Sequence, residues 1–113
     1  MSDLRPAEIA PVGPVQVARY AAAVQDFNPV HFDRAFATWA GLPSTIVHGP
    51  LSVALALDAI VAQLGATALR SLEARLRAPV FPGEELRLTP TDTGAEVTKA
   101  DGTVALTLSF ERS

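Results

Sequence analysis

The sequence predicts an α+β domain in which a curved antiparallel sheet wraps around one central apolar helix. The first observation is that the segment from Pro50 to Leu64 is apolar on nearly every face, so other parts of the chain must cover it. The second is that residues 70–113 alternate apolar and polar side chains between turn signals, as half-buried antiparallel strands do. A length of 113 residues with 49% hydrophobic content is enough for one core, so we expect residues 1–113 to form a single domain.

The N-terminal segment, residues 1–12, is polar and contains proline. Residues 8–12 have the composition of a short first strand that enters the fold. The first six residues lack the basic and then apolar run of a secretory signal peptide, and we therefore expect a cytoplasmic protein.

Residues 13–47 are predicted to form a helical insertion. Gly13 and Pro14 read as a cap and a first-turn proline, and apolar residues then recur at helical spacing up to Val24. A second short helix is expected from Asp33 to Trp39, ended by residues 41–43. We expect the aromatic side chains here to form core and pocket wall together, namely Tyr20, Phe27, Phe32, Phe36 and Trp39.

The central helix is assigned to residues 48–65, because Pro50 suits a first turn and Gly65 a C-terminal cap. Asp58 disturbs its apolar pattern. A buried carboxylate is costly unless it is paired or reaches a pocket. Two readings stay open: a structural partner such as Arg70 or Arg77 or a subunit contact, and a catalytic carboxylate.

The sheet is assigned to residues 70–113. Apolar residues alternate with charged ones from Leu72 to Val80, and three turn signals separate the strands that follow. The turns are Pro82-Gly83, Asp92-Thr93-Gly94 and Asp101-Gly102, and the strands between and after them are 84–91, 96–99 and 104–110. An antiparallel sheet curled around one apolar helix is the hot-dog fold.

Composition excludes several classes of site and partner. The chain has no Cys, and its two His without clustered carboxylates make a zinc site improbable, so we expect no metal. A net charge of −3 leaves no basic stripe for nucleic acid. The uncharged stretch between Arg34 and Asp58 is interrupted by glycines and prolines, so we predict a loop and a buried helix there, not a membrane span.

The segment from Asp26 to His31, Asp-Phe-Asn-Pro-Val-His, contains the candidate chemistry. Pro29 lacks an N–H and biases Asn28 toward an extended conformation, so this segment should be a bent loop. Such a loop can turn Asp26 and His31 toward one point, and an acid and a base aimed at one water suit hydration and dehydration. The alternative is a plain helix-terminating turn, because Asp, Asn and Pro are ordinary turn residues.

The surroundings of this loop resemble the MaoC-like family of (R)-specific enoyl-CoA hydratases and dehydratases. The shared features are an aromatic residue (Tyr20), Asp-x-Asn-Pro, an aliphatic residue, His31, and Ala37 six residues later. The resemblance extends through Ile46-Val47-His48-Gly49 and the segment 72–88, and covers nearly the whole chain from about Val15. Many members carry Gly or another small residue just before the Asp, where this chain has Val24-Gln25.

The resemblance implies reversible hydration of a trans-2-enoyl thioester to an (R)-3-hydroxyacyl thioester. Asp26 would then be the base, and His31 would orient the water and share the proton transfers. Asn28 would brace the loop or the water, although a turn residue that bonds nearby backbone is an equal reading. Gly49 would let the thioester approach the helix N-terminus, whose N–H groups and dipole receive charge on the carbonyl oxygen; a simple helix-entry turn at His48-Gly49 is the alternative.

We expect no cofactor beyond the coenzyme A or phosphopantetheine carried by the acyl thioester substrate. The expected partner is a second hot-dog subunit, in a homodimer or a heterodimer, with no nucleic acid and no membrane. Three alternatives remain: a thioesterase that uses Asp58, a subunit of a heteromeric dehydratase, and a non-catalytic acyl-binding protein.

Overall fold

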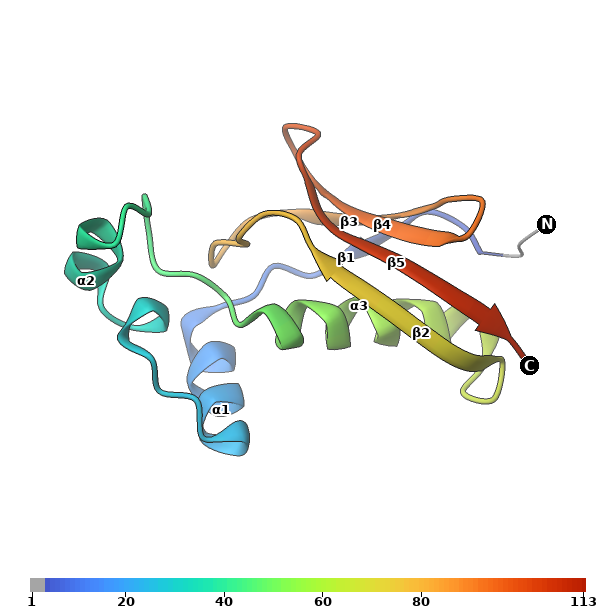
Figure 1. Cartoon of the computed structure of the whole chain (residues 1–113), viewed down its shortest axis with the longest axis horizontal. Coiled ribbons are helices and arrows are strands. Elements are labelled where there is room, and N and C mark those ends of the chain that lie inside the picture. The colour runs from blue at the N-terminus through green and yellow to red at the C-terminus, as the bar shows by residue number, and fades with distance from the viewer. Residues whose placement is uncertain (1–3) are drawn as a thin grey trace.

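The computed structural model describes residues 4–113 and has the shorter helices at one end and, at the other, a sheet that lies over the longest helix (Figure 1). The predictions for residues 1–3 lie outside this range. The helical elements are α1 (Pro14–Val24), the 3-10 helix η1 (Pro29–His31), α2 (Arg34–Trp39) and α3 (Gly49–Leu64). The strands are β1 (Ala7–Ile9), β2 (Leu69–Leu76), β3 (Leu86–Pro90), β4 (Gly94–Lys99) and β5 (Val104–Arg112).

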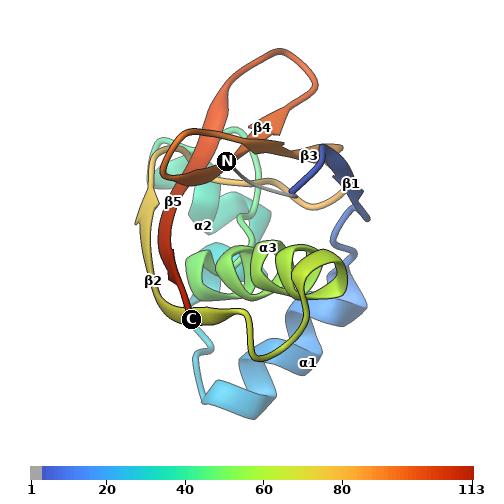
Figure 2. The same cartoon turned by 90° about the vertical axis from the view of Figure 1, so that its right-hand side faces the viewer.

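The five strands form one antiparallel sheet in the order β1-β3-β4-β5-β2. Figure 2 looks along α3 and shows the sheet curling over it, with β2 on one side and β1 on the other. The predicted α+β hot-dog architecture is therefore confirmed. None of the helices in the described part of the chain has the length and hydropathy that a bilayer span requires.

The core lies between α3 and the concave face of the sheet. From α3, Leu51, Ala56 and Ile60 are buried, and they pack in one cluster with inward residues of β3, β4 and β5 such as Leu88, Val97 and Leu106. Each large apolar side chain buried in this way contributes about 1.5 to 3 kcal/mol.

The opposite stripe of α3 is exposed, which corrects the expectation that the helix is covered all round. Ala54, Asp58 and Ala62, four residues apart, all face solvent. The Asp58 carboxylate therefore stays hydrated and needs no ion-pair partner. Among the described residues no basic side chain forms an ion pair with Asp58, and the expected partners Arg70 and Arg77 do not do so either.

Two strand predictions were wrong in their limits. β1 spans Ala7–Ile9, not residues 8–12, and β2 ends at Leu76 although the apolar alternation continues to Val80. After Leu76 the ladder breaks, because the N–H groups of both Arg77 and Ala78 donate to the Ala105 carbonyl. The Val80 carbonyl then accepts from the Val47 N–H at 2.8 Å, so the segment continues as extended chain that supports the entry to α3.

The helical insertion projects beyond one end of the sheet (Figure 1). As a result, aromatic side chains predicted as core are open to solvent: Trp39 is 81% exposed, Phe27 58% and Phe32 45%. Tyr20 is half-buried and packs against the core. Phe36, the fifth of these aromatic residues, is half-buried. The predicted core role thus holds for Tyr20 and is wrong for Phe27, Phe32 and Trp39.

Candidate active site

The end of α1 fixes the position of Asp26. Gln25 caps the helix with φ of 60°, in the left-handed region, and so reverses the chain direction. The Asp26 N–H then donates to the Ala21 carbonyl at 3.0 Å. The Asp26 side chain, 50% exposed, is left accessible at the start of the loop.

The loop between Asp26 and His31 is held by its own side chains. The Asn28 side-chain oxygen accepts from the Val30 N–H at 3.0 Å and so caps η1, in which Pro29 occupies the first turn. The Asp26 Oδ1 atom accepts from the Asn28 N–H at 3.3 Å. Asn28 therefore braces the turn that brings His31 back toward Asp26.

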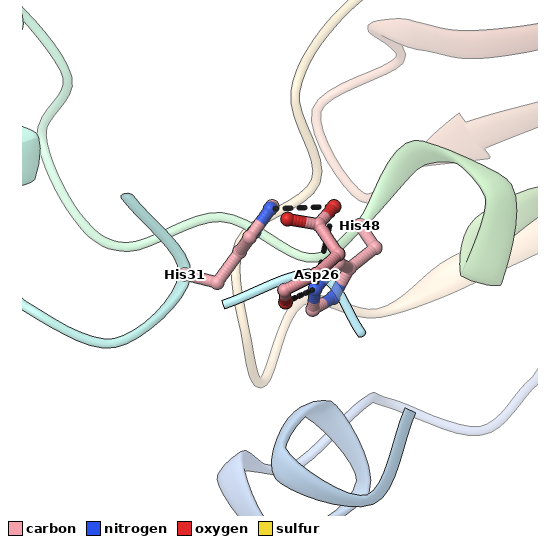
Figure 3. A group of neighbouring side chains, drawn as sticks. All are labelled: Asp26, His31 and His48. Atoms are coloured by element: carbon pink, nitrogen blue, oxygen red, sulfur yellow. Dashed lines mark hydrogen bonds and ion pairs between the residues drawn. The ribbon is translucent and has the colours of Figure 1, made fainter. Parts of the chain in front are cut away.

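His31 lies against Asp26 in a defined tautomer. Its Nδ1 atom is 2.8 Å from the Ile46 carbonyl, and because a carbonyl can only accept, Nδ1 carries the proton. The Nε2 atom then faces Asp26 Oδ2 at 3.8 Å. That separation is too long for a direct hydrogen bond, so the two groups flank a small gap (Figure 3).

His48 also belongs to this cluster, although the sequence analysis gave it no role of its own. It is 1% exposed, and its ring stacks on that of His31 with centroids 3.6 Å apart and planes 20° apart. Its Nε2 atom lies 3.1 Å from the Asp26 carbonyl and 3.9 Å from Asp26 Oδ2. The Tyr20 ring packs against it at 5.0 Å.

The three side chains do not fit a metal ion in this arrangement. Ligand atoms of Asp26, His31 and His48 lie within 4.8 Å of one another. An imidazole binds a metal along a lone pair in its ring plane, at about 2.1 Å. Because the two rings are stacked and nearly parallel, their lone pairs run side by side and do not converge on one ion. The arrangement suits proton transfer better than metal binding.

Gly49 offers a free donor at the N-terminus of α3. Pro50 has no N–H, and the N–H groups of Leu51 and Ser52 both donate to the His48 carbonyl, at 3.1 and 3.2 Å. Among residues 4–113, no acceptor pairs with the Gly49 N–H. A Cβ added at Gly49 would lie 2.5 Å from Leu76 Cδ1, so any side chain at this position would displace Leu76.

A cavity of about 290 Å³ lies beside this helix entry. Its wall is mostly apolar and includes Ile46, Gly49, Leu76 and Leu106. Ile46 links the cavity to the cluster, because its carbonyl accepts the proton of His31 Nδ1. Gly49 thus borders this cavity directly, and the Asp26–His31 pair is connected to it through Ile46.

A model of the MaoC-like domain matches residues 3–111 of the chain. The chain belongs to this family. The match covers the loop from Asp26 to His31, the start of α3 and all of the sheet except Arg112, in agreement with the resemblance seen in the sequence.

Curated relatives of this MaoC-like domain include enzymes of enoyl-thioester chemistry. Over 65 residues it is 48% identical to 3-hydroxyacyl-thioester dehydratase Y of Mycobacterium tuberculosis, a match that covers 54% of this chain and 22% of that enzyme. Over 78 residues it is 41% identical to the (R)-specific enoyl-CoA hydratase of Aeromonas caviae, covering 66% of this chain and 57% of the relative. The matched region spans about a fifth of the first and little more than half of the second.

Solved structures agree with the fold. The (R)-hydratase of A. caviae, involved in PHA biosynthesis, superposes with a TM-score of 0.78 and 27% identity over 97% of this chain and 96% of that one. The ChsH1-ChsH2 complex of M. tuberculosis matches with a TM-score of 0.77 and 22% identity, over 97% of this chain and 93% of that one, which supports the fold alone.

Asp58 stands apart from the cluster in this MaoC-like domain. It is nine residues along α3 from Gly49, a distance of about 13 Å at the helical rise of 1.5 Å per residue. The residues that the structure brings together are Asp26, His31 and His48, with Gly49 adjacent in the chain to His48. Only the partnership of His48 with the other two was missing from the sequence prediction.

Proposed function

We propose that this MaoC-like domain hydrates trans-2-enoyl thioesters to (R)-3-hydroxyacyl thioesters and catalyses the reverse dehydration. The observation that carries this proposal is the 3.8 Å separation of Asp26 Oδ2 and His31 Nε2. A water at about 2.8 Å from both atoms, the usual hydrogen-bond distance, would bridge them. The water would donate to both groups, which leaves its oxygen lone pair directed away from them.

In the hydration direction, that oxygen attacks the β-carbon of the enoyl thioester. The Asp26 carboxylate takes one proton from the water as the new C–O bond forms, and one proton reaches the α-carbon through the Asp26–His31 pair. One water is thereby added across the double bond, with no net change of protons on the enzyme. Dehydration is the same path reversed.

Negative charge develops on the thioester carbonyl oxygen during this addition. The Gly49 N–H lies at the N-terminus of the 16-residue helix α3 and has no acceptor among residues 4–113. These two observations support a role for this N–H as the oxyanion donor. The adjacent apolar cavity would then hold the acyl chain. Asn28 serves by holding the loop through its bond to Val30.

The acyl group of the proposed substrate is carried on coenzyme A or phosphopantetheine, and the reaction needs no further cofactor. A base, a proton relay and an oxyanion donor on the chain supply each chemical step described above. The stacking of the two imidazoles further disfavours a metal at this cluster.

We propose that the domain works with a second hot-dog subunit. β2 lies at the end of the sheet order, so its eight residues leave one edge without a partner in the described chain. Leu76, on this strand and at the cavity wall, is 60% exposed. A second copy, or a related chain, would cover both the strand edge and the cavity mouth.

The test is an absorbance assay with a short trans-2-enoyl-CoA, run on the purified assembly. Loss of the conjugated enoyl band, with the (R)-3-hydroxyacyl thioester as product, is the expected result. Free thiol is measured in the same samples. Release of thiol without hydration would favour the thioesterase alternative, and formation of only the (S) product would contradict the proposed site.

A further inference from the structure

His48 makes more contacts in the cluster than a helix-entry residue needs. It is buried, it stacks on His31, and it approaches the Asp26 carbonyl, so it joins the end of α1, η1 and the start of α3. We infer that His48 is a positioning residue for the proposed hydration, holding Asp26 and His31 in register without exchanging a proton itself. This inference rests on the function proposed above.

The tautomer of His48 follows from its partner. The Asp26 carbonyl oxygen, 3.1 Å away, can only accept, so Nε2 must carry the proton that it donates. Asp26 is thereby held from both sides of its backbone, by its own N–H to the Ala21 carbonyl and by His48 at its carbonyl. This matters because the Asp26 side chain is half exposed and accepts one hydrogen bond, from Asn28, among the described residues.

The surroundings of the second nitrogen of His48 agree with the Nε2–H tautomer. Nδ1 is fully buried and has no hydrogen-bond partner in the described chain. A lone pair without a partner is tolerated there more readily than an N–H without an acceptor. A second proton would also place a cation against the face of His31, which shares the proton transfers of the proposed reaction. The surroundings of Nδ1 therefore fit a ring that positions its neighbours through Nε2.

The stack also limits the orientation of His31. One face of its ring lies on His48, and the Phe32 ring meets it edge-on at 6.4 Å. Together with the Nδ1 bond to Ile46, these contacts direct His31 Nε2 toward Asp26. Small displacements of such a pair are costly, since a misplacement of about 1 Å can reduce a rate by about 10².

Two substitutions separate the contributions of the ring and of its donor. His48→Phe keeps a flat ring beneath His31 and removes the donor to the Asp26 carbonyl. His48→Gln keeps an N–H donor of similar reach and removes the ring. We expect His48→Phe to lower kcat by about 10 to 100-fold, with KM changed less than about threefold, because Gly49 and the cavity wall are untouched. The kcat of His48→Gln should be at least about fivefold higher than that of His48→Phe, because the hydrogen bond to the Asp26 carbonyl is restored.

A merely structural residue would behave differently. Both variants would then lose activity in proportion to their loss of folded protein, and equal kcat values in folded His48→Phe and His48→Gln would overturn the inference. Wild-type rates for both variants would overturn it too. Thermal melts and circular dichroism of the same samples measure the folded fraction.

An independent readout does not require activity. The chain has two histidines, so long-range ¹H–¹⁵N spectra of the imidazoles contain two patterns, and the His48→Gln variant identifies which belongs to His31. We expect the Nε2–H tautomer for His48 and the Nδ1–H tautomer for His31. An Nδ1–H tautomer at His48 would overturn the inference. If the wild-type protein failed to hydrate enoyl thioesters, the proposed function would fail, while this test would still decide whether His48 holds the Asp26 carbonyl through Nε2–H.

Discussion

Gln25 determines the direction in which Asp26 leaves α1. It has φ of 60°, a conformation that costs a residue with a side chain about 1 to 2 kcal/mol relative to glycine. This is the position at which the resemblance pointed to Gly or another small residue in related proteins. The Gln25 side chain recovers part of that cost, since its amide donates to the Ala22 carbonyl at 2.8 Å.

Gln25→Gly should therefore raise the free energy of unfolding by about 1 kcal/mol, because glycine adopts the left-handed conformation without strain. Gln16→Gly is the matched control within the same helix. Gln16 is exposed and helical, so its replacement should lower stability by about 0.5 kcal/mol. Urea denaturation of the three proteins measures both differences, and two shifts of the same sign would contradict this account of the α1 terminus.

At the site, the sequence could indicate the residues that act within one loop but not those that meet across loops. Asp26, Asn28 and His31 share a six-residue segment, and Pro29 alone predicts that it bends. His48 lies 22 residues from Asp26, and the contact depends on the return path of the chain after α2. Its position immediately before Gly49 was the available signal, and it also fits an ordinary helix entry.

At the scale of elements, apolar periodicity predicted the type of each segment better than its limits. Ala78 and Val80 continue the alternation of β2 because extended chain places every second residue inward whether or not the ladder continues. For α3, the apolar composition indicated burial on all sides, but the sheet covers one face and small side chains occupy the other. Composition does not distinguish a covered alanine from an exposed one.

The exposed face of α3 gives a prediction for Asp58. Because the carboxylate is in solvent and about 13 Å along the helix from Gly49, Asp58→Asn should leave the hydration rate within about twofold and the unfolding free energy within about 0.5 kcal/mol. Enoyl-CoA absorbance and urea denaturation check the two values. Loss of thiol release in a stable, fully folded Asp58→Asn variant would instead favour the thioesterase alternative.

At the scale of the whole molecule, two open features support the proposed second subunit. Within residues 4–113 the outer edge of β2 has no partner strand, and three aromatic side chains of the helical insertion are exposed, with Trp39 at 81%. The shorter outer strand, β1, has three residues and offers little to pair with.

Sedimentation velocity over a range of concentrations should therefore show a dimer of the 11.9 kDa chain. If the natural partner is a different hot-dog chain, co-expression should give a heterodimer, and the isolated chain should associate weakly. A monodisperse monomer with full hydratase activity would contradict both forms of this prediction.

The central claim is that Asp26 and His31 act as one unit on one water, and a double-mutant cycle on the hydration rate tests it most directly. Asp26→Asn keeps the shape and removes the base, so the rate should fall by about 10² to 10⁴, and His31→Ala should fall comparably. The double variant should be within about threefold of the slower single variant, because members of a catalytic unit are not additive. Retention of most of the wild-type rate by Asp26→Asn, or a double variant whose loss equals the product of the two single losses, would contradict the claim.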